Sequence, residues 1–400
     1  MKRFKRNLIK TTLIFFLLLT HQISALCQTR ESSPQPEMDS VEVSLLTCGP
    51  RPAIYSLYGH TAIRYQDKAH GTDIVINYGM FSFGKPFFVL RFVFGLTDYE
   101  MGIEYFSDFL AQYSPSGCGV RQQTLNLTSK EKAAIAAAID ENYRPENRVY
   151  RYNYFYDNCT TRARDIITSH IDGTTVYKRE ADSEATFRSM IHKYNETHRW
   201  ARFGNDLLLG VKADRPTTLS EQQFLPENLS NDFATAEIDG NGARRHLVSN
   251  DTWILPRTQD VGSDSFPLSP TACMASLATL IVLLTLAECR MKANLWQLDT
   301  ILMLADGLCG LILLAMVFSQ HPTVSLNLQI LLLNPISAIM LVPTVKALRR
   351  QRANRWLKAW AACIILFIAG GFIQSYAEGM YFVALSLLFR YSVKIHLFKK

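Results

Sequence analysis

The sequence predicts an α+β domain that is exported from the cytoplasm, followed by a membrane domain of five transmembrane helices. Three observations support this fold class. A short apolar run lies near the N-terminus, the composition is mixed and water-compatible up to residue 265, and apolar runs dominate from there to the end. We therefore expect residues 1–26 to be a signal peptide, 27–265 an exported catalytic domain and 266–400 the membrane domain.

The N-terminus has the three parts of a secretory signal. The basic stretch MKRFKRNLIK is followed by the apolar run TTLIFFLLL and by HQISAL, whose small residues suit cleavage near Ala25. The apolar run is too short to span a bilayer comfortably. Cleavage is the prediction, and a retained anchor is the alternative that the sequence leaves open.

The C-terminal part contains segments long and apolar enough to span a membrane. They cover residues 270–288, 295–318, 324–345, 356–374 and 379–396. The loops CRMKAN and KALRRQRANRWLK are basic and are expected to face the cytoplasm. This predicts a multi-pass protein of the bacterial inner membrane, with its N-terminal domain in the periplasm and its C-terminus in the cytoplasm.

Charge and motifs exclude several classes of function. The net charge of +7 owes much to the basic loops, and no basic stripe with interleaved aromatics predicts nucleic-acid binding. The motifs CxxC, HExxH, GxSxG and GxGxxG are absent, so neither a metal site nor a cofactor is expected. Cys48 and Cys118 could form a disulfide in an oxidising compartment, although the sequence does not fix the pairing.

Cys159 in YDNCTTRARDII is a candidate nucleophile. If Asn158 caps a helix, Cys159 is its first residue, where the positive end of the helix dipole favours the thiolate. The alternative is a small apolar side chain on the buried face of an amphipathic helix.

A general base is predicted in an upstream hairpin. LYGHTAIRYQD alternates like a strand and places His60 on one face, and the following strand, DIVINYGMF, contains Asn77. An amide can hold an imidazole in the tautomer that accepts a thiol proton, so Asn77 is the candidate that orients His60. The alternative is an ordinary hairpin whose histidine bonds a backbone group.

The order of these residues, histidine before cysteine, resembles the permuted papain-like enzymes related to the NlpC/P60 and LRAT types. The stretches SLLTCGPRPAIYSLYGHTAIRYQD, INYGMFSF, YNYFYDNCTTRARDII, DLLLGVKADRPTT and FLPENL occur in the order found in the Lnb family, which the chain resembles over nearly its whole mature length. These are lipoprotein N-acyltransferases of Bacteroidota. The resemblance implies a permuted papain-like exported domain, with His60 and Cys159 at the catalytic positions and Asn77 as a third member.

The activity that this resemblance implies has a phospholipid as acyl donor and a diacylglyceryl lipoprotein as acceptor. The acyl chain would pass through a thioester on Cys159 to the α-amine of the lipoprotein's N-terminal cysteine. Tyr58, Asn158, Arg64 and Arg162 are candidates for oxyanion or substrate binding. Two alternatives stay open: a periplasmic cysteine peptidase acting on peptidoglycan, and a non-catalytic envelope scaffold in which Cys159 is disulfide-bonded or inert.

The membrane part contains polar residues that are candidates for a second site. Asp299 and Asp306 are seven residues apart on one expected span, as are Asn327 and Asn334 on the next, so each pair is expected to share a helix face. Asparagines also join helices to one another, which is the alternative for that pair. His321 is expected in a short exported loop, facing the catalytic domain. Two further basic residues, Arg390 and Lys394, are expected to reach toward the cytoplasm.

Overall fold

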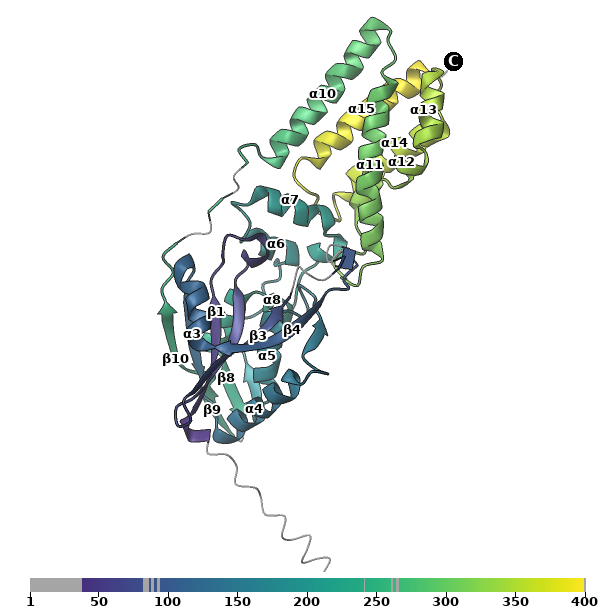
Figure 1. Cartoon of the computed structure of the whole chain (residues 1–400). Coiled ribbons are helices and arrows are strands. Elements are labelled where there is room, and N and C mark those ends of the chain that lie inside the picture. Colours follow the sequence, from purple (N-terminus) through teal and green to yellow (C-terminus); the bar gives the residue numbers. More distant parts are fainter. Residues whose placement is uncertain are drawn as a thin grey trace, which may run out of the picture. The chain divides into compact units, whose positions relative to one another are not determined.

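The structure is a computed structural model, in which a sheet-rich N-terminal half is followed by a helical C-terminal half (Figure 1). It describes residues 38–81, 86–87, 90–91, 94–240, 242–259, 262–263 and 266–398. The predicted signal peptide lies outside the described residues. The predicted order, an α+β part followed by a helical part, is confirmed.

A seven-stranded antiparallel sheet forms the centre of the N-terminal half within the described residues. Its strands lie in the order β10-β5-β1-β2-β3-β4-β6. Their bounds are β1 Val41–Cys48, β2 His60–Asp67, β3 Thr72–Met80, β4 Asp98–Tyr105, β5 Val120–Leu125, β6 Val149–Arg151 and β10 Val248–Leu255. A smaller sheet contains β7 Thr174–Val176, β8 Glu237–Gly240 and β9 Ala243–His246. The predicted hairpin is confirmed as β2 and β3, with Ala62 opposite Asn77.

Helices pack against the main sheet on the side that carries the candidate cysteine. Helix α5 (Cys159–Thr168) contacts β2 and β3, and α9 (Pro226–Thr235) contacts β1 and β10. The amphipathic sequence of α5 accounts for this packing, because Ala163, Ile166 and Ile167 are all buried. The other helices of this half are α3 Phe106–Tyr113, α4 Ser129–Tyr143, α6 Phe187–His192, α7 Arg199–Leu208 and α8 Leu219–Gln222, with 3-10 turns at Met38–Ser40, Ile54–Ser56, Ser114–Ser116 and Val211–Asp214.

The membrane half has fewer straight spans than the five expected. In the described part of the chain, three helices are long and apolar enough to cross a membrane: α10 Pro270–Met291, α11 Trp296–Val317 and α15 Met380–Leu397. Helix α15 packs against α10 and against α14, Arg355–Gly370, which falls short of the required length at 16 residues (Figure 1). Residues 266–398, as the structure describes them, therefore do not contain five unbroken spans.

The third expected span, residues 324–345, is broken. It consists of the 3-10 turn η5 Leu328–Leu331, α12 Ile336–Ile339 and α13 Leu341–Arg349, with a bend of 77° before α13. Pro335, which directly follows Asn334, has no N–H for a helical hydrogen bond, so a continuous helix cannot pass through it without a defect. Counted as one bent span, this segment raises the number in the described part of the chain to four.

A cluster of buried amides joins the helical half to α7. Asn327 Nδ2 donates to the carbonyl of Leu207 at 2.9 Å, Gln329 Nε2 to that of Asp206 at 2.8 Å, and Gln374 Nε2 to that of Leu209 at 3.0 Å. Asp206 and Leu207 lie in the last turn of α7 and Leu209 is its C-cap, so these carbonyls have no intrahelical donor. The amide cluster thus fixes the C-terminal end of α7 to the membrane half.

The backbone strengthens the same connection. Gly210 N–H donates to Thr323 O at 2.8 Å, and Val211 N–H donates to Leu326 O at 2.8 Å. A Cβ atom at Gly210 would lie 2.0 Å from Leu326 O, so a side chain there would force the two segments apart. The loop after α11 is therefore held close to the N-terminal half.

Candidate active site

Cys159 is the first residue of α5, as predicted. The side-chain oxygen of Asn158 accepts hydrogen bonds from the N–H groups of Thr160 and Thr161, each at 2.9 Å, which satisfies donors that the helix start leaves free. The amide nitrogen of Asn158 donates to Tyr154 O and Phe224 O, each at 2.9 Å. Asn158 therefore holds the helix start in place, and both ends of its amide are occupied.

His60 is oriented by Asn77, the residue that the sequence indicated. His60 Nε2 lies 2.9 Å from Asn77 Oδ1, and Asn77 Nδ2 donates to Glu104 Oε1 at 2.6 Å. Because the Glu104 carboxylate only accepts hydrogen bonds, it fixes which end of the Asn77 amide faces His60. The proton of His60 then resides on Nε2, and Nδ1 is the ring nitrogen that remains for the thiol.

The thiol and the imidazole influence each other's ionisation. Burial opposes the thiolate, but the charge on His60, a hydrogen bond with His60 and the Thr61 backbone N–H outweigh it, so the pKa of Cys159 lies below its ordinary value. Burial likewise opposes the imidazolium, yet the charge and hydrogen bond of Cys159 and the bond with Asn77 raise the pKa of His60. Both shifts favour a thiolate and imidazolium pair, which is the reactive form of a cysteine nucleophile.

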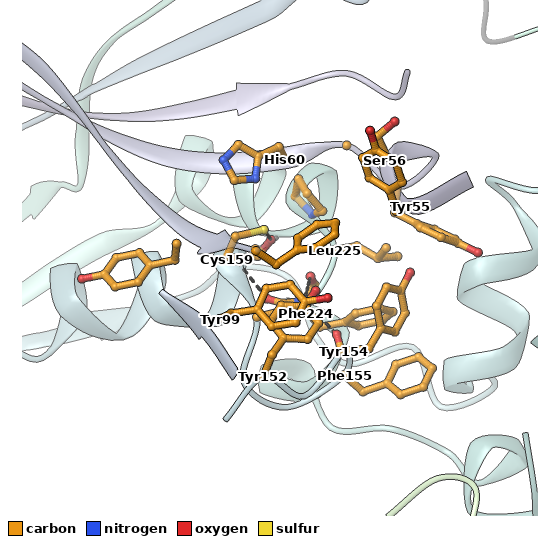
Figure 2. A pocket seen from close by; sticks show the side chains of 18 of the residues that line it. Tyr55, Ser56, His60, Tyr99, Tyr152, Tyr154, Phe155, Cys159, Phe224 and Leu225 are labelled. Atoms are coloured by element: carbon orange, nitrogen blue, oxygen red, sulfur yellow. Dashed lines mark hydrogen bonds between the residues drawn. The ribbon is translucent and has the colours of Figure 1, made fainter. Parts of the chain in front are cut away.

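The pair faces a cavity of about 760 Å³ with a largely apolar lining. Figure 2 shows His60 and Cys159 next to one another, with Tyr99, Tyr152 and Tyr154 grouped on one side of them. Tyr154 packs edge-on against Tyr58, Phe155 and Phe224, which builds a wall of aromatic rings. An elongated apolar molecule is the kind of ligand that such a lining suits.

The mouth and the far end of the cavity are also apolar. Ile54 and Tyr55 line it from the turn after β1, and each is 63% exposed. Met316 and Val324 line it from the membrane half, together with His321. The cavity is thus built jointly by the N-terminal half and the loop after α11, and the expectation that His321 faces the catalytic domain agrees with this position.

The other predicted binding residues differ in their positions. Tyr58 lines the cavity, and its hydroxyl oxygen accepts a hydrogen bond from Asn205 Nδ2 at 2.8 Å. The side chains of Arg64 and Arg162 do not line it. Arg64 pairs with Asp73 through bonds of 2.8 and 2.6 Å, and Arg162 pairs with Asp157 through bonds of 2.6 and 2.9 Å. Both guanidinium groups are occupied by neighbouring carboxylates, so neither position supports the predicted contact with substrate.

The polar residues of the membrane half do not form the expected site. Asp299 is fully buried and binds Arg390 through bonds of 2.6 and 2.9 Å. Asp306 accepts the N–H of Asn334 at 3.1 Å beside the break in the third span. Asn334 and Asn327 do not share a helix face, because Asn327 precedes η5 and Asn334 precedes α12.

The basic residues of the last helix are a second correction. Arg390 and Lys394, which were expected to reach toward the cytoplasm, are buried and pair with Glu288 and Asp299. Glu288 on α10 and Asp299 on α11 neutralise these two charges, so the free-energy cost of burying them is lower than for an isolated charge.

Glu104 is a site residue that the sequence did not indicate. Its second oxygen accepts a bond from Gln112 Nε2 at 2.6 Å, so the carboxylate is fixed on both sides. It reaches Asn77 only because β4 pairs with β3 with Val75 opposite Glu104. An alternating strand pattern in residues 98–105 was the one available signal, and it carries no information about this pairing.

Cys48, Cys118 and the potential metal ligands form no second centre among the residues that the structure describes. Cys48 and Cys118 are free and buried in the same apolar cluster, so the disulfide considered from the sequence is not formed. Burial raises the pKa of Cys48 far above its ordinary range, which makes it a poor nucleophile. No group of three or more His, Cys, Asp or Glu residues in the described part of the chain is arranged to hold a metal ion.

Comparison with known families agrees with this architecture. Residues 32–193 match the family described as Lnb N-terminal periplasmic domain, and residues 262–400 match Lnb transmembrane domain. The chain belongs to the Lnb family. Lnb membership makes it a multi-pass membrane protein with a periplasmic N-terminal domain, and it associates the chain with lipoprotein processing.

No curated protein and no solved structure matches the chain. The permuted papain-like type of the Lnb periplasmic domain therefore stays a prediction. It is compatible with a histidine on a hairpin strand and a cysteine at the start of a helix packed on that hairpin.

Proposed function

We propose that the protein is a cysteine-dependent acyltransferase. It moves an acyl chain from a phospholipid, through a thioester on Cys159, to the α-amine of the N-terminal diacylglyceryl-cysteine of lipoproteins. One observation carries the proposal: the pair of Cys159 and His60 opens into an apolar cavity lined by both the periplasmic domain and the membrane half. Both substrates are lipids, and a cavity that continues toward the membrane half lets their chains stay out of water.

The first half-reaction acylates the cysteine. The Cys159 thiolate attacks the carbonyl carbon of the phospholipid ester, and a C–S bond forms as the ester C–O bond breaks. The His60 imidazolium gives its proton to the leaving oxygen, which releases a lysophospholipid. The Asn77 side chain keeps the imidazole in position through the bond at His60 Nε2.

The second half-reaction transfers the chain to the amine. The neutral α-amine of the lipoprotein attacks the thioester carbonyl, and His60, now neutral, accepts one of its protons. A C–N bond forms, the C–S bond breaks, and the thiolate and imidazolium pair is restored. The backbone N–H of Cys159 is suited to stabilise the oxyanion in each step, because Asn158 already takes the N–H groups of Thr160 and Thr161 and the helix dipole adds to the Cys159 donor.

The alternatives have less support from the site. A peptidase acting on peptidoglycan needs polar groups for sugars and peptides along its cleft, whereas aromatic and aliphatic side chains dominate this cavity. A scaffold needs no reactive thiol, whereas Cys159 is free, borders the cavity and is paired with a histidine.

Complementation tests the proposal. Cells that lack their own lipoprotein N-acyltransferase would receive the wild-type protein, Cys159→Ser, or Cys289→Ser as a control at an exposed cysteine of α10. We expect the N-terminal lipopeptide of a lipoprotein to gain one acyl chain with the wild type and the control, and none with Cys159→Ser. A wild-type protein that is inserted but leaves lipoproteins unchanged, while peptidoglycan fragments change, would instead identify a peptidase.

A further inference from the structure

Arg51 is a cation in the wall of the cavity that the two half-reactions leave unexplained. It follows β1 in the turn that precedes η2, and its N–H donates to Ser56 O at 3.0 Å. Its guanidinium carbon lies 4.7 Å from the centre of the Tyr113 ring, which is buried at the end of α3. This stacking fixes the position of the charge beside the cavity.

No carboxylate pairs with Arg51 among the residues that the structure describes. Two arginines of the main sheet behave differently: Arg64 binds Asp73 and Arg121 binds Asp251, each through two hydrogen bonds. A guanidinium that is partly removed from water and lacks a counter-ion favours an anionic ligand, and phosphate matches its geometry. The charge of Arg51 also acts on His60, where it opposes the rise in the pKa, so it lies within electrostatic range of the reacting pair.

The two lipids differ in the group that a cation can bind. A phospholipid donor has a phosphodiester close to the ester that is cleaved, whereas a diacylglyceryl-cysteine acceptor has no phosphate and has an amine that is cationic when protonated. Within the proposed function, on which this inference rests, we infer that Arg51 binds the phosphodiester of the donor lipid and places its ester carbonyl at Cys159. The acyl chains then lie along the aromatic wall toward Met316 and Val324.

This assignment gives Arg51 a role in one half-reaction alone. It promotes formation of the acyl-enzyme from a phospholipid, and it makes no direct contact with a donor that lacks a phosphate.

Binding is the first test. The full-length protein with Cys159→Ala, in detergent, would be titrated with dihexanoyl phosphatidylglycerol, with dihexanoylglycerol and with inorganic phosphate. We expect Arg51→Gln to weaken binding of the phospholipid about 10- to 100-fold, the range for a hydrogen bond to a charged group. The affinity of Arg51→Lys for the phospholipid should lie between those of the wild type and Arg51→Gln. Arg144→Gln, which removes an exposed charge at the C-terminal end of α4, should leave this affinity unchanged.

The two other ligands show whether Arg51 binds the phosphodiester of the lipid, its acyl chains or free phosphate. Dihexanoylglycerol should bind with equal affinity to the proteins with Arg51 and with Arg51→Gln. Inorganic phosphate should bind far more weakly than the lipid, because it leaves the apolar cavity empty. Equal loss of both lipids in Arg51→Gln, or no loss of either, would overturn the inference, and tight binding of phosphate alone would assign Arg51 to free phosphate.

Acylation of Cys159 is the second test, in the protein with an intact thiol. Arg51→Gln should slow thioester formation from the phospholipid about 10- to 100-fold and change the rate from an uncharged p-nitrophenyl acyl ester far less, through the charge of Arg51 on His60 alone. Equal slowing with both donors would contradict a phosphate contact. If the wild type forms no thioester with any donor, the proposed function fails, while Arg51-dependent phospholipid binding by the Cys159→Ala protein would still establish the phosphodiester site.

Discussion

Two of the clusters of buried polar side chains in this protein differ in whether their groups are fully used by one another. In the membrane half, Arg390 and Lys394 are matched by Glu288 and Asp299, so positive and negative charges are equal in number and bound to one another. In the periplasmic domain, Asn77 and Glu104 occupy one side of His60, while Cys159 borders a cavity. The first cluster uses its polar groups to hold α10, α11 and α15 together, whereas the second keeps a reactive pair accessible.

This difference shows that burial of a charge inside a span does not identify a substrate site by itself. The carboxylate of Asp299 has every feature that marks a functional residue in a membrane, yet its oxygens are used by Arg390. An adjoining cavity distinguishes the periplasmic cluster. Three sets of variants sharpen the contrast, from the largest expected effect to the smallest.

The largest effect is expected on stability, from Asp299→Asn. Removing one charge leaves Arg390 and Lys394 with only Glu288, an uncompensated buried charge that costs about 3–5 kcal/mol. The midpoint of thermal unfolding in detergent should fall strongly and insertion should suffer. Cys159→Ala should leave that midpoint nearly unchanged and abolish acyl transfer. A loss of acyl transfer in Asp299→Asn at an unchanged midpoint, with transfer retained in Cys159→Ala, would place the function in the membrane cluster.

An intermediate effect is expected on the ionisation of the thiol, from His60→Ala. Without the imidazolium, the burial that opposes the thiolate prevails, so the pKa of Cys159 should rise above its ordinary value. The rate of alkylation by iodoacetamide against pH measures this directly. In the wild type its midpoint should lie below that of an ordinary thiol, and in His60→Ala above it. Coinciding midpoints would show that His60 does not act on Cys159.

The smallest effect is expected from Glu104→Gln. A neutral amide can present its nitrogen to Asn77 as well as its oxygen, so Asn77 and hence His60 lose their fixed orientation. The acyl transfer rate should fall about 5-fold, which corresponds to about 1 kcal/mol for one hydrogen bond. Glu141→Gln on α4 is a matched control at an exposed carboxylate. Equal rates in the two variants would remove Glu104 from the site.

The parts of the site that follow local rules were predictable from the sequence. A cap at Asn158 depends on the next three residues, and the faces of His60 and Asn77 depend on alternation along one hairpin. Glu104 and Arg51 depend on tertiary contacts, namely the pairing of β4 with β3 and the stacking of Arg51 on α3. No local pattern records either contact.

The differences between the prediction and the structure have equally specific reasons. Arg64 and Arg162 were assigned to substrate although Asp73 and Asp157, nine and five residues away, were available to neutralise them. The third span was expected to be continuous because hydropathy alone does not register the break at Pro335. The pairing of Arg390 with Asp299 joins residues 91 positions apart, so only the packed helices reveal it.

The account depends most on the claim that Cys159 accepts an acyl chain from a phospholipid. The most direct test is the intact mass of the purified full-length protein after incubation with a phospholipid of defined chains. We expect the mass to rise by one acyl group, on the peptide that contains Cys159, with removal by neutral hydroxylamine and no gain in Cys159→Ser. A wild-type protein that binds the phospholipid and keeps its original mass, or that carries the acyl group at another residue, would contradict the account.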